Sequence, residues 1–122
     1  MPQMVRLISA VLDCPDVSAL AAFYAEITDG AVIYDDGAWA TVDGPGGRID
    51  FQQSSTYVRP TWPDPAVPMQ VHLDFRVDDP DGAEARVLAA GAVKLDSVPN
   101  DHFRVYADPA GHPFCLCTVD FP

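Results

Sequence analysis

Basic side chains are scarce in this chain. Its 122 residues include seven Lys and Arg against eighteen Asp and Glu, which gives a formal net charge of −11. Proteins that bind nucleic acids neutralise phosphates with clustered Lys and Arg, so the composition argues against a nucleic-acid partner. The acidic balance is typical of a well-hydrated surface, and it would also attract a cationic ligand.

Long apolar runs are missing as well. No run approaches the ~18 residues that a membrane span needs, so no membrane partner is expected. The first residues, from Met1 to Arg6, lack the apolar stretch of a secretory signal, which makes a cytoplasmic protein the expectation. The chain is 48% hydrophobic and 20% charged, which is the composition of a globular protein, and its length suits a single domain, residues 1–122.

Cysteine is rare, and the familiar catalytic motifs are absent. The odd number of cysteines, three, argues against a disulfide framework in a cytoplasmic chain. Cys115 and Cys117 point the same way on one expected strand, but such a pair alone is a weak metal signal, and we expect buried, apolar cysteines. The sequence lacks a nucleophile elbow and a dinucleotide fingerprint. Its glycine-rich segment 44–47 joins two expected strands and opens no helix, so it offers no phosphate site.

What the sequence does contain is an internal repeat. Gly-Ala-Val occurs at residues 30–32 and again 61 residues later, at 91–93. An Asp-x-x-Gly turn occurs at residues 43–46 and again 65 residues later, at 108–111. Self-similarity at this period indicates two copies of one unit, each too small to close a core alone. We place repeat unit one at 5–54, a Pro-rich linker at 55–68 and repeat unit two at 69–120.

Each unit is predicted to have the order βαβββ. Hydrophobic periodicity and turn signals predict, in the first unit, a strand at 6–12, a helix capped by Asp16 or Ser18 that reaches Thr28 and stops at Gly30, and strands at 31–35, 38–42 and 48–53. The second unit has a predicted strand at 69–77, a helix at 80–90, and strands at 92–96, 103–107 and 113–119.

Clean alternation on two of these strands predicts the architecture. From Val71 to Val77 every odd position is apolar and every even position is polar, and residues 49–52 repeat the pattern. One face of each sheet should therefore pack on a helix while the other meets water or a ligand. We expect an α+β fold in which two βαβββ repeats form a curved mixed sheet, with a half-barrel cleft between the units and the helices on the outer face.

At this point the chain resembles the vicinal oxygen chelate superfamily, specifically its glyoxalase-like and bleomycin-resistance-like members. The resemblance covers essentially the whole chain through its paired βαβββ organisation. Its most specific local matches are the strand from His72 to Asp79 and the turn and strand from Asp108 to Cys115, which contain an Asp-Pro-x-Gly signature before the last strand. The resemblance implies a small-molecule ligand and a homodimer.

The resemblance also implies four inward-facing positions that hold a divalent metal ion in metal-dependent members. In this chain they fall on Ser9, Asp50, His72 and Cys115. Imidazole and carboxylate suit first-row metals, so Asp50 and His72 are the expected metal ligands. Neutral Ser9 is a poor ligand and the Cys115 thiol is mismatched, so the site is weak unless Gln52, Asp74 or the substrate completes it.

Several residues allow two interpretations. His72 is either a metal ligand or general base, or it is a groove side chain that is hydrogen-bonded to Asp74 or Gln52.

Two charged pairs and the tryptophans also allow two interpretations. Each pair, Arg76 with Asp74 and Arg48 with Asp50, could orient a ligand, or its two members could simply pair with each other. We favour pairing. Trp62 in the linker either covers the cleft as a lid or packs in a subunit interface. We expect Trp39 in the core, and His102 and His112 exposed to solvent.

Two functions follow. The leading one is a small-molecule binding protein without the usual complete metal site, which holds a hydrophobic or cationic ligand in the cleft. Its expected ligand-binding residues are Asp50, Gln52, His72, Asp74, Cys115 and Trp62, and no catalytic residue is assigned. The alternative is a divalent-metal-dependent lyase, isomerase or dioxygenase that uses Asp50 and His72 as metal ligands.

Overall fold

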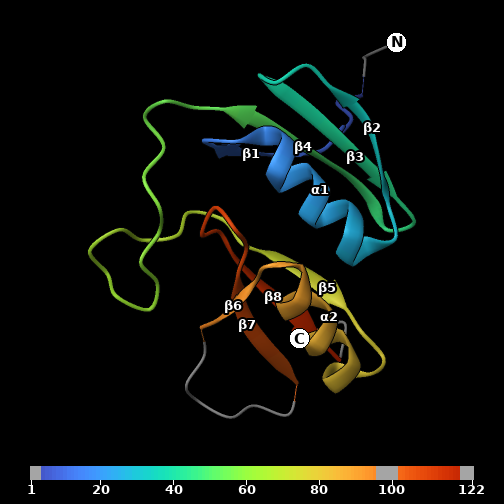
Figure 1. Ribbon diagram of the computed structural model, residues 1–122, viewed down its shortest axis with the longest axis vertical. Helices are drawn as coiled ribbons and strands as arrows, with labels where there is room; N and C mark the ends of the chain where they lie inside the picture. The colour runs from blue at the N-terminus through green and yellow to red at the C-terminus, as the bar shows by residue number, and fades with distance from the viewer. Residues whose placement is uncertain (1–3, 96–101, 119–122) are drawn as a thin grey trace. The chain divides into compact units, whose positions relative to one another are not determined.

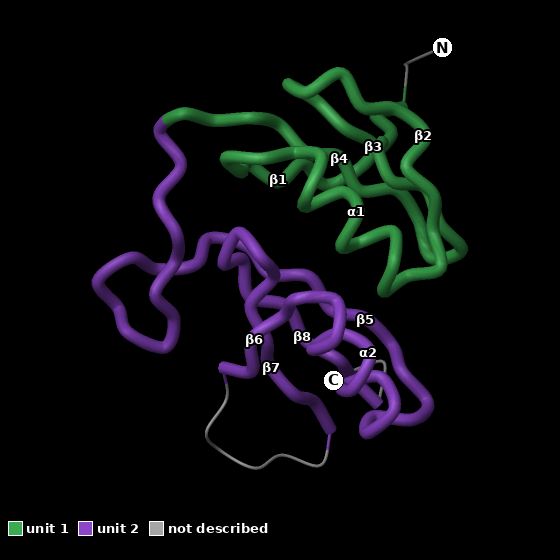
Figure 2. The backbone as a smooth tube through the Cα atoms, in the orientation of Figure 1, with its two compact units in different colours: residues 1–55 green, residues 56–122 purple. Residues whose placement is uncertain are grey.

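The fold is α+β and consists of two βαβββ units, as the repeat predicts. The computed structural model describes residues 4–95 and 102–118. The chain divides into two compact units, residues 1–55 and 56–122 (Figure 2), so the Pro-rich linker belongs almost wholly to the second unit. Within these described ranges, each unit has its own four-stranded mixed sheet and one helix. No helix among the described residues is long and apolar enough to cross a membrane.

The first unit builds its sheet in the order β1-β4-β3-β2 (Figure 1). Its elements are β1 (Ala10–Cys14), α1 (Val17–Thr28), β2 (Ala31–Asp35), β3 (Trp39–Gly44) and β4 (Gly47–Gln53). Strand β1 runs parallel to β4, while β2, β3 and β4 are antiparallel neighbours. Helix α1 lies against this sheet, where the Tyr24 ring stacks on Phe51 with centroids 5.7 Å apart.

The ends of α1 show which of Asp16 and Ser18 caps the helix, and they correct the prediction that Gly30 stops it. Asp16 is the N-cap, because its side chain accepts a hydrogen bond from the Ala19 backbone N–H at 3.1 Å. The predicted stop at Gly30 is wrong by one residue, since Asp29 takes the left-handed conformation at φ 56° and caps the helix. Asp is one of the few residues that tolerate this conformation. Gly30 serves close packing instead, because a Cβ there would lie 3.0 Å from the Asp43 carbonyl oxygen.

The second unit repeats the arrangement in the sheet order β5-β8-β7-β6. Its elements are β5 (Leu73–Arg76), α2 (Pro80–Ala90), β6 (Val93–Lys94), β7 (Phe103–Ala107) and β8 (Pro113–Cys117). Helix α2 has the predicted bounds, because Asp79 caps its start and Gly91, at φ 120°, ends it. In the core, the Phe114 ring stacks on Tyr106 at 5.6 Å and meets Phe75 edge-on at 6.0 Å.

The first strand of each unit is shorter than predicted. Alternation marks an extended chain, but a strand also needs a hydrogen-bonded neighbour. The pairing of β1 with β4 begins at Ala10, opposite Ile49, and that of β5 with β8 begins at Leu73, opposite Phe114. Sequence periodicity therefore gives the two faces of these strands but not their ends.

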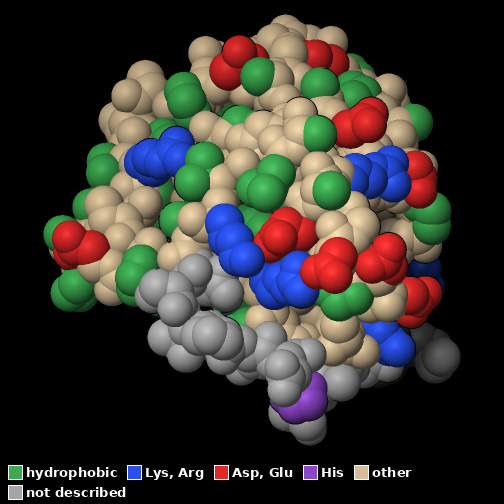
Figure 3. Space-filling view, turned by 60° about the horizontal axis from the view of Figure 1, so that its bottom comes forward, with side chains coloured by type: hydrophobic (Ala, Val, Ile, Leu, Met, Phe, Trp, Pro, Cys, Tyr) green, Lys and Arg blue, Asp and Glu red, His purple; other side chains and the backbone are tan. Residues whose placement is uncertain are grey.

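Charged side chains of both signs border α2. The Glu84 carboxylate accepts hydrogen bonds from Lys94 at 2.9 Å and from the Tyr106 hydroxyl at 2.8 Å, and Arg104 pairs with Asp81 at 2.9 Å. On the face of the molecule shown in Figure 3, Asp and Glu side chains lie among Lys and Arg side chains. The excess of acidic residues is therefore locally compensated on this face.

The linker packs on the Asp-x-x-Gly turn of its own unit. The Tyr57 hydroxyl donates to the Ala110 carbonyl at 3.0 Å, and its ring lies 5.1 Å from the His112 ring. His112 Nδ1 lies 2.8 Å from a carboxylate oxygen of Asp108, which is completely buried. The predicted exposure of His112 is therefore wrong, because its side chain is only 13% exposed. His102 is exposed, as predicted.

Candidate functional site

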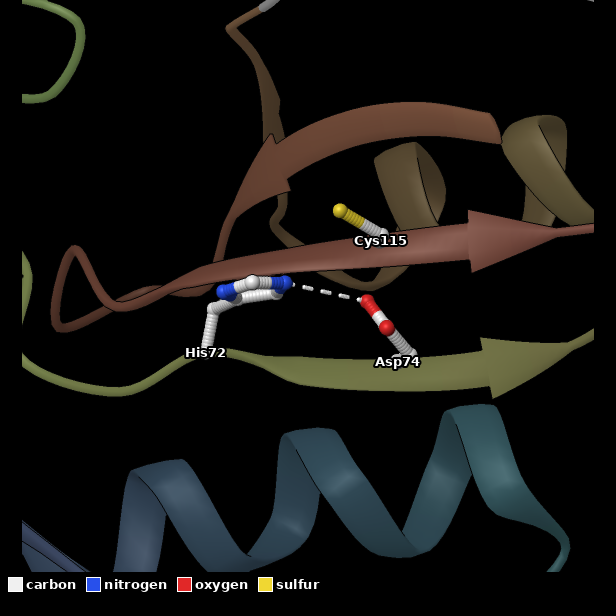
Figure 4. A group of neighbouring side chains, drawn as sticks. All are labelled: His72, Asp74 and Cys115. Atoms are coloured by element: carbon white, nitrogen blue, oxygen red, sulfur yellow. Dashed lines mark ion pairs between the residues drawn. The ribbon is translucent and has the colours of Figure 1, made fainter. Parts of the chain in front are cut away.

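Three side chains of the second unit bring metal-ligating atoms together (Figure 4). His72 lies directly before β5, Asp74 is in β5, and Cys115 stands opposite Asp74 in the parallel neighbour β8. One ligand atom from each lies within 4.8 Å of the other two. His72 Nε2 is 3.2 Å from Asp74 Oδ1. We call these three residues the donor cluster.

The donor cluster lies on the sheet face opposite α2. Side chains alternate along β5, so His72 and Asp74 point away from the face where Phe75 meets Phe114. The side chains of His72 and Asp74 are 41% and 60% exposed, while Cys115 is 7% exposed. The structure confirms the predicted alternation, the burial of Cys115 and the pairing of His72 with Asp74.

Cys117 stays outside the donor cluster. Burial, together with the charge of the neighbouring Asp74 carboxylate, raises the pKa of the Cys117 thiol above its usual value of 9.0. Cys117 therefore remains a neutral thiol near pH 7. Because only a thiolate is a good metal ligand, Cys117 is a poor candidate for one. Among the described residues, Cys115 alone contributes sulfur to the donor cluster.

The first unit holds Asp50 in a different environment. Asp50 is only 2% exposed, and its carboxylate oxygens accept hydrogen bonds from the hydroxyls of Ser9 and Thr41. The Arg48 Nε donates to both carboxylate oxygens, at 3.1 and 3.2 Å. We call these four residues the Asp50 cluster. The pairing of Arg48 with Asp50, which the sequence favoured, is confirmed.

The hydrogen bonds decide the charge of Asp50. Burial acts to raise the pKa of its carboxyl group, but the bonds from Ser9, Thr41 and Arg48 outweigh burial and bring the pKa below its ordinary value. Asp50 is therefore ionised near neutral pH. Each of its oxygens already accepts two hydrogen bonds, which takes up its lone pairs.

Sequence reasoning missed Thr41. It belongs to the cluster because it stands directly opposite Asp50 in the antiparallel pair β3 and β4. The hairpin register, counted from the turn at residues 44–47, is the signal that would have placed it there.

The other expected ligand residues, Gln52 and Trp62, belong to neither cluster. Gln52 is exposed on β4 and shares the sheet side of Asp50, because it is two residues further along the strand. Trp62 is half-buried in the linker, beside Thr61, whose hydroxyl donates to the carbonyls of Asp64 and Val67 at 2.9 and 3.2 Å. Trp39 is also half-buried. The role of Trp62 as a lid remains a prediction.

Comparison with known families identifies the fold. A model of the glyoxalase-like domain matches residues 9–117. This chain belongs to the glyoxalase-like family, within the vicinal oxygen chelate superfamily. A search of curated proteins found no match.

Solved structures agree with this assignment at low sequence identity. The fosfomycin resistance protein FosX from Mesorhizobium loti has a TM-score of 0.74 and 15% identity, over 98% of this glyoxalase-like chain and 95% of its own. A mutant FosX from Listeria monocytogenes in complex with Mn(II) and a dihydroxypropylphosphonic acid has a TM-score of 0.70 and 18% identity, over 95% and 91%. A glyoxalase/bleomycin resistance protein from Albidiferax ferrireducens has a TM-score of 0.66 and 14% identity, over 91% and 96%.

The two units differ in how well they suit a metal ion. Asp50 does not suit it, because its lone pairs are taken by hydrogen bonds, and Ser9 is one of the donors of those bonds. The donor cluster of the second unit does suit one, since imidazole, carboxylate and thiolate are the ligands that zinc takes in proteins. Thiolate is a poorer match for Mg²⁺ or Mn²⁺. The predicted pair of metal ligands, Asp50 and His72, thus finds geometric support at His72 alone.

Proposed function

We propose that this glyoxalase-like protein binds a small organic molecule and lacks the usual four-ligand metal site. The observation that carries the proposal is the Asp50 cluster. The resemblance assigns Asp50 to a metal-ligand position, yet its carboxylate is buried and fully hydrogen-bonded to Ser9, Thr41 and Arg48. Retaining a metal ion there would require these hydrogen bonds to break.

The ligand is proposed to contact the polar face of each sheet. His72 and Asp74 are accessible from solvent, with side chains 41% and 60% exposed. Gln52 is exposed on the polar face of the first unit. Of the residues expected from the sequence, Gln52, His72, Asp74, Cys115 and Trp62 are the proposed contacts. Asp50, which was also expected to bind the ligand, is buried and fully hydrogen-bonded, so its proposed role is indirect, through Arg48. The cleft between the two units remains a prediction.

A thermal-shift screen tests this function. The protein, purified without a metal-chelating tag, is melted with a panel of cationic, neutral and anionic small molecules, with and without EDTA. A ligand that binds only the native state stabilises it by about 2.7 kcal/mol at a hundred times its Kd. We expect at least one class to raise the melting temperature equally with and without EDTA. Stabilisation that disappears with EDTA would contradict metal-free binding.

The second candidate function is a divalent-metal-dependent lyase, isomerase or dioxygenase. The donor cluster favours it, because three suitable ligand atoms lie within 4.8 Å of one another. His72, Asp74 and Cys115 would hold the ion, and a bound ion would polarise an oxygen atom of the substrate. Elemental analysis distinguishes the two functions. A stoichiometric ion that is lost in Cys115→Ser but kept in the matched control Cys117→Ser would establish a metal site at the donor cluster and overturn metal-free binding.

We also propose that the protein is a homodimer. Strand β2 presents three consecutive large apolar side chains that are exposed, namely Val32, Ile33 and Tyr34 at 41%, 59% and 52%. Strand β2 is also an edge of its sheet, and exposed apolar side chains on an edge strand are typical of a surface that pairs with another chain. Light scattering after size-exclusion chromatography should give twice the chain mass of 13.2 kDa. Ile33→Lys should shift the protein toward the monomer, and a wild-type monomer at micromolar concentration would refute the proposal.

A further inference from the structure

The guanidinium of Arg48 is held by one nitrogen only. Its Nε donates to both oxygens of Asp50, at 3.1 and 3.2 Å. Its two Nη groups make no hydrogen bond or ion pair with any residue that the structure describes. A guanidinium has five N–H donors in a rigid plane, so four donors remain for a ligand or for water.

The anchor that orients Arg48 is rigid. Asp50 is 2% exposed, and the hydroxyls of Ser9 and Thr41 hold its carboxylate from two other segments of the unit. The Arg48 side chain is 40% exposed, so its outer edge is accessible. An arginine that is already oriented loses little rotamer entropy when it binds a ligand, and this favours affinity.

The ion pair between Arg48 and Asp50 also determines which charge a ligand would meet at the cluster. Arg48 and Asp50 together are neutral, so Asp50 offers no net attraction to the cationic ligand that the sequence suggested. What the cluster presents is the Nη edge of a guanidinium. Two parallel N–H groups match two oxygens of one anionic group, which makes arginine the preferred partner of carboxylates and phosphates.

Two neighbours narrow the class of anion. Asp43, the β3 partner of Arg48, is exposed and makes no ion pair with Arg48 within the part of the chain that the structure describes. Its negative charge penalises a dianion more than a monoanion. Val11, the β1 partner of Asp50, is 44% exposed and provides an apolar neighbour.

We propose that Arg48 is the anchoring residue for an organic monocarboxylate, bound through the two Nη groups with its apolar body toward Val11. This inference rests on the proposed function and names its ligand class. The Arg48 side chain binds and orients the ligand, and Asp50 is a positioning residue that acts through Arg48.

Benzoate is the probe for the test. Methylphosphonate is the dianionic comparison, and both are measured in mildly alkaline buffer, above the second ionisation of the phosphonate. Binding is followed by calorimetry and by the nitrogen-15 resonances of the arginine side chains. Loss of one bidentate, charge-assisted contact weakens binding about ten- to hundred-fold. We expect benzoate to shift the Arg48 resonances and to bind more tightly than methylphosphonate. Arg48→Gln should weaken benzoate binding at least ten-fold, whereas Arg6→Gln, which removes an exposed arginine, should change it less than two-fold.

A second variant guards against a folding defect. Arg48→Gln leaves the buried Asp50 carboxylate without its cation, so its melting curve is measured first. Arg48→Lys retains the positive charge beside Asp50 but lacks the planar pair of donors. We expect Arg48→Lys to melt close to the wild type and still to bind benzoate at least five-fold more weakly.

Each contrary result has a distinct meaning. Equal losses in Arg48→Lys and Arg6→Gln, or Arg48 resonances that do not move with benzoate, would overturn the inference. Tighter binding of methylphosphonate would overturn the choice of a monoanion. If neutral or cationic ligands stabilise the protein without metal while benzoate does not bind, the inference fails and the proposed function stands. If benzoate binds through Arg48 only when a metal ion is present, metal-free binding fails and the Arg48 anchor stands.

Discussion

Asp50→Asn tests the Asp50 cluster with a nearly isosteric change. The amide oxygen, in the place of Oδ1, can still accept the hydrogen bonds from Thr41 and Arg48 Nε, but the amide nitrogen, in the place of Oδ2, cannot accept those from Ser9 and Arg48 Nε. The substitution therefore removes the charge and two hydrogen bonds without opening a cavity. We expect a folded protein of lower stability.

The magnitude follows from burial. A hydrogen bond to a charged group contributes about 1.5–3 kcal/mol, and the bond from Ser9 is of this kind because Asp50 is 2% exposed. The pair with Arg48 contributes less, about 1 kcal/mol, because the Arg48 side chain is 40% exposed and water replaces its partner. The free energy of unfolding should therefore fall by about 3 kcal/mol, equivalent to roughly 10 °C in melting temperature.

Urea unfolding at several pH values measures both the loss and its cause. The pKa of Asp50 is lower in the folded protein than its ordinary value, so the charge adds stability that is present above that value and is lost as pH falls. The difference between wild type and Asp50→Asn should shrink in acid. Asp43→Asn, which changes an exposed carboxylate on the neighbouring strand, should cost less than 0.5 kcal/mol. An Asp50→Asn loss below 1 kcal/mol, or one that is constant with pH, would refute the reasoning.

Two further predictions concern the second unit. Hydrogen bonds from Lys94 and Tyr106 lower the pKa of Glu84, so the Glu84 carboxylate adds stability above its ordinary pKa of 4.5, and this stability is lost as pH falls. In urea unfolding, Glu84→Gln should lower the free energy of unfolding by about 1 kcal/mol at pH 7 and by much less at pH 3. An equal loss at both pH values would count against this role. Gly111 lies at φ 99°, and a Cβ there would lie 2.3 Å from Arg59 Cγ. Gly111→Ala should lower the free energy of unfolding, measured by calorimetry, by about 1–2 kcal/mol. The double variant with Arg59→Ala should recover only part of this loss, because the backbone strain remains. Full recovery would assign the whole effect to the clash with Arg59.

The sequence predicts well what depends on local periodicity. The order of elements, the bounds of α2 and the two faces of β5 follow from repeating apolar positions and from caps such as Asp79. Helix α1 ends at Thr28 as predicted, but Asp29 rather than Gly30 adopts the left-handed conformation that caps it. Local signals thus locate elements to within a few residues.

The contacts within the candidate site depend on register, which local signals do not carry. Thr41 reaches Asp50 because nine residues of hairpin bring them opposite each other, and Ser9 reaches it from a segment 41 residues away. The sequence around His112 does not show which side chain its ring contacts. The turn folds the ring onto the buried Asp108, four residues earlier. The pairing of His72 with Asp74 was among the alternatives only because the two residues share one strand face.

The repeat explains why the two copies of one position have diverged. The 65-residue offset equates Asp50 in β4 with Cys115 in β8, and each faces a neighbour of matching polarity. Thr41 stands opposite Asp50 and donates to it, whereas Val105, 5% exposed, stands opposite Cys115 and can donate nothing. A buried carboxylate without donors is costly, while a buried thiol is not. Each residue thus suits its own unit: the Asp50 carboxylate is saturated by hydrogen bonds in the first unit, whereas the Cys115 thiol lies beside His72 and Asp74 in the second.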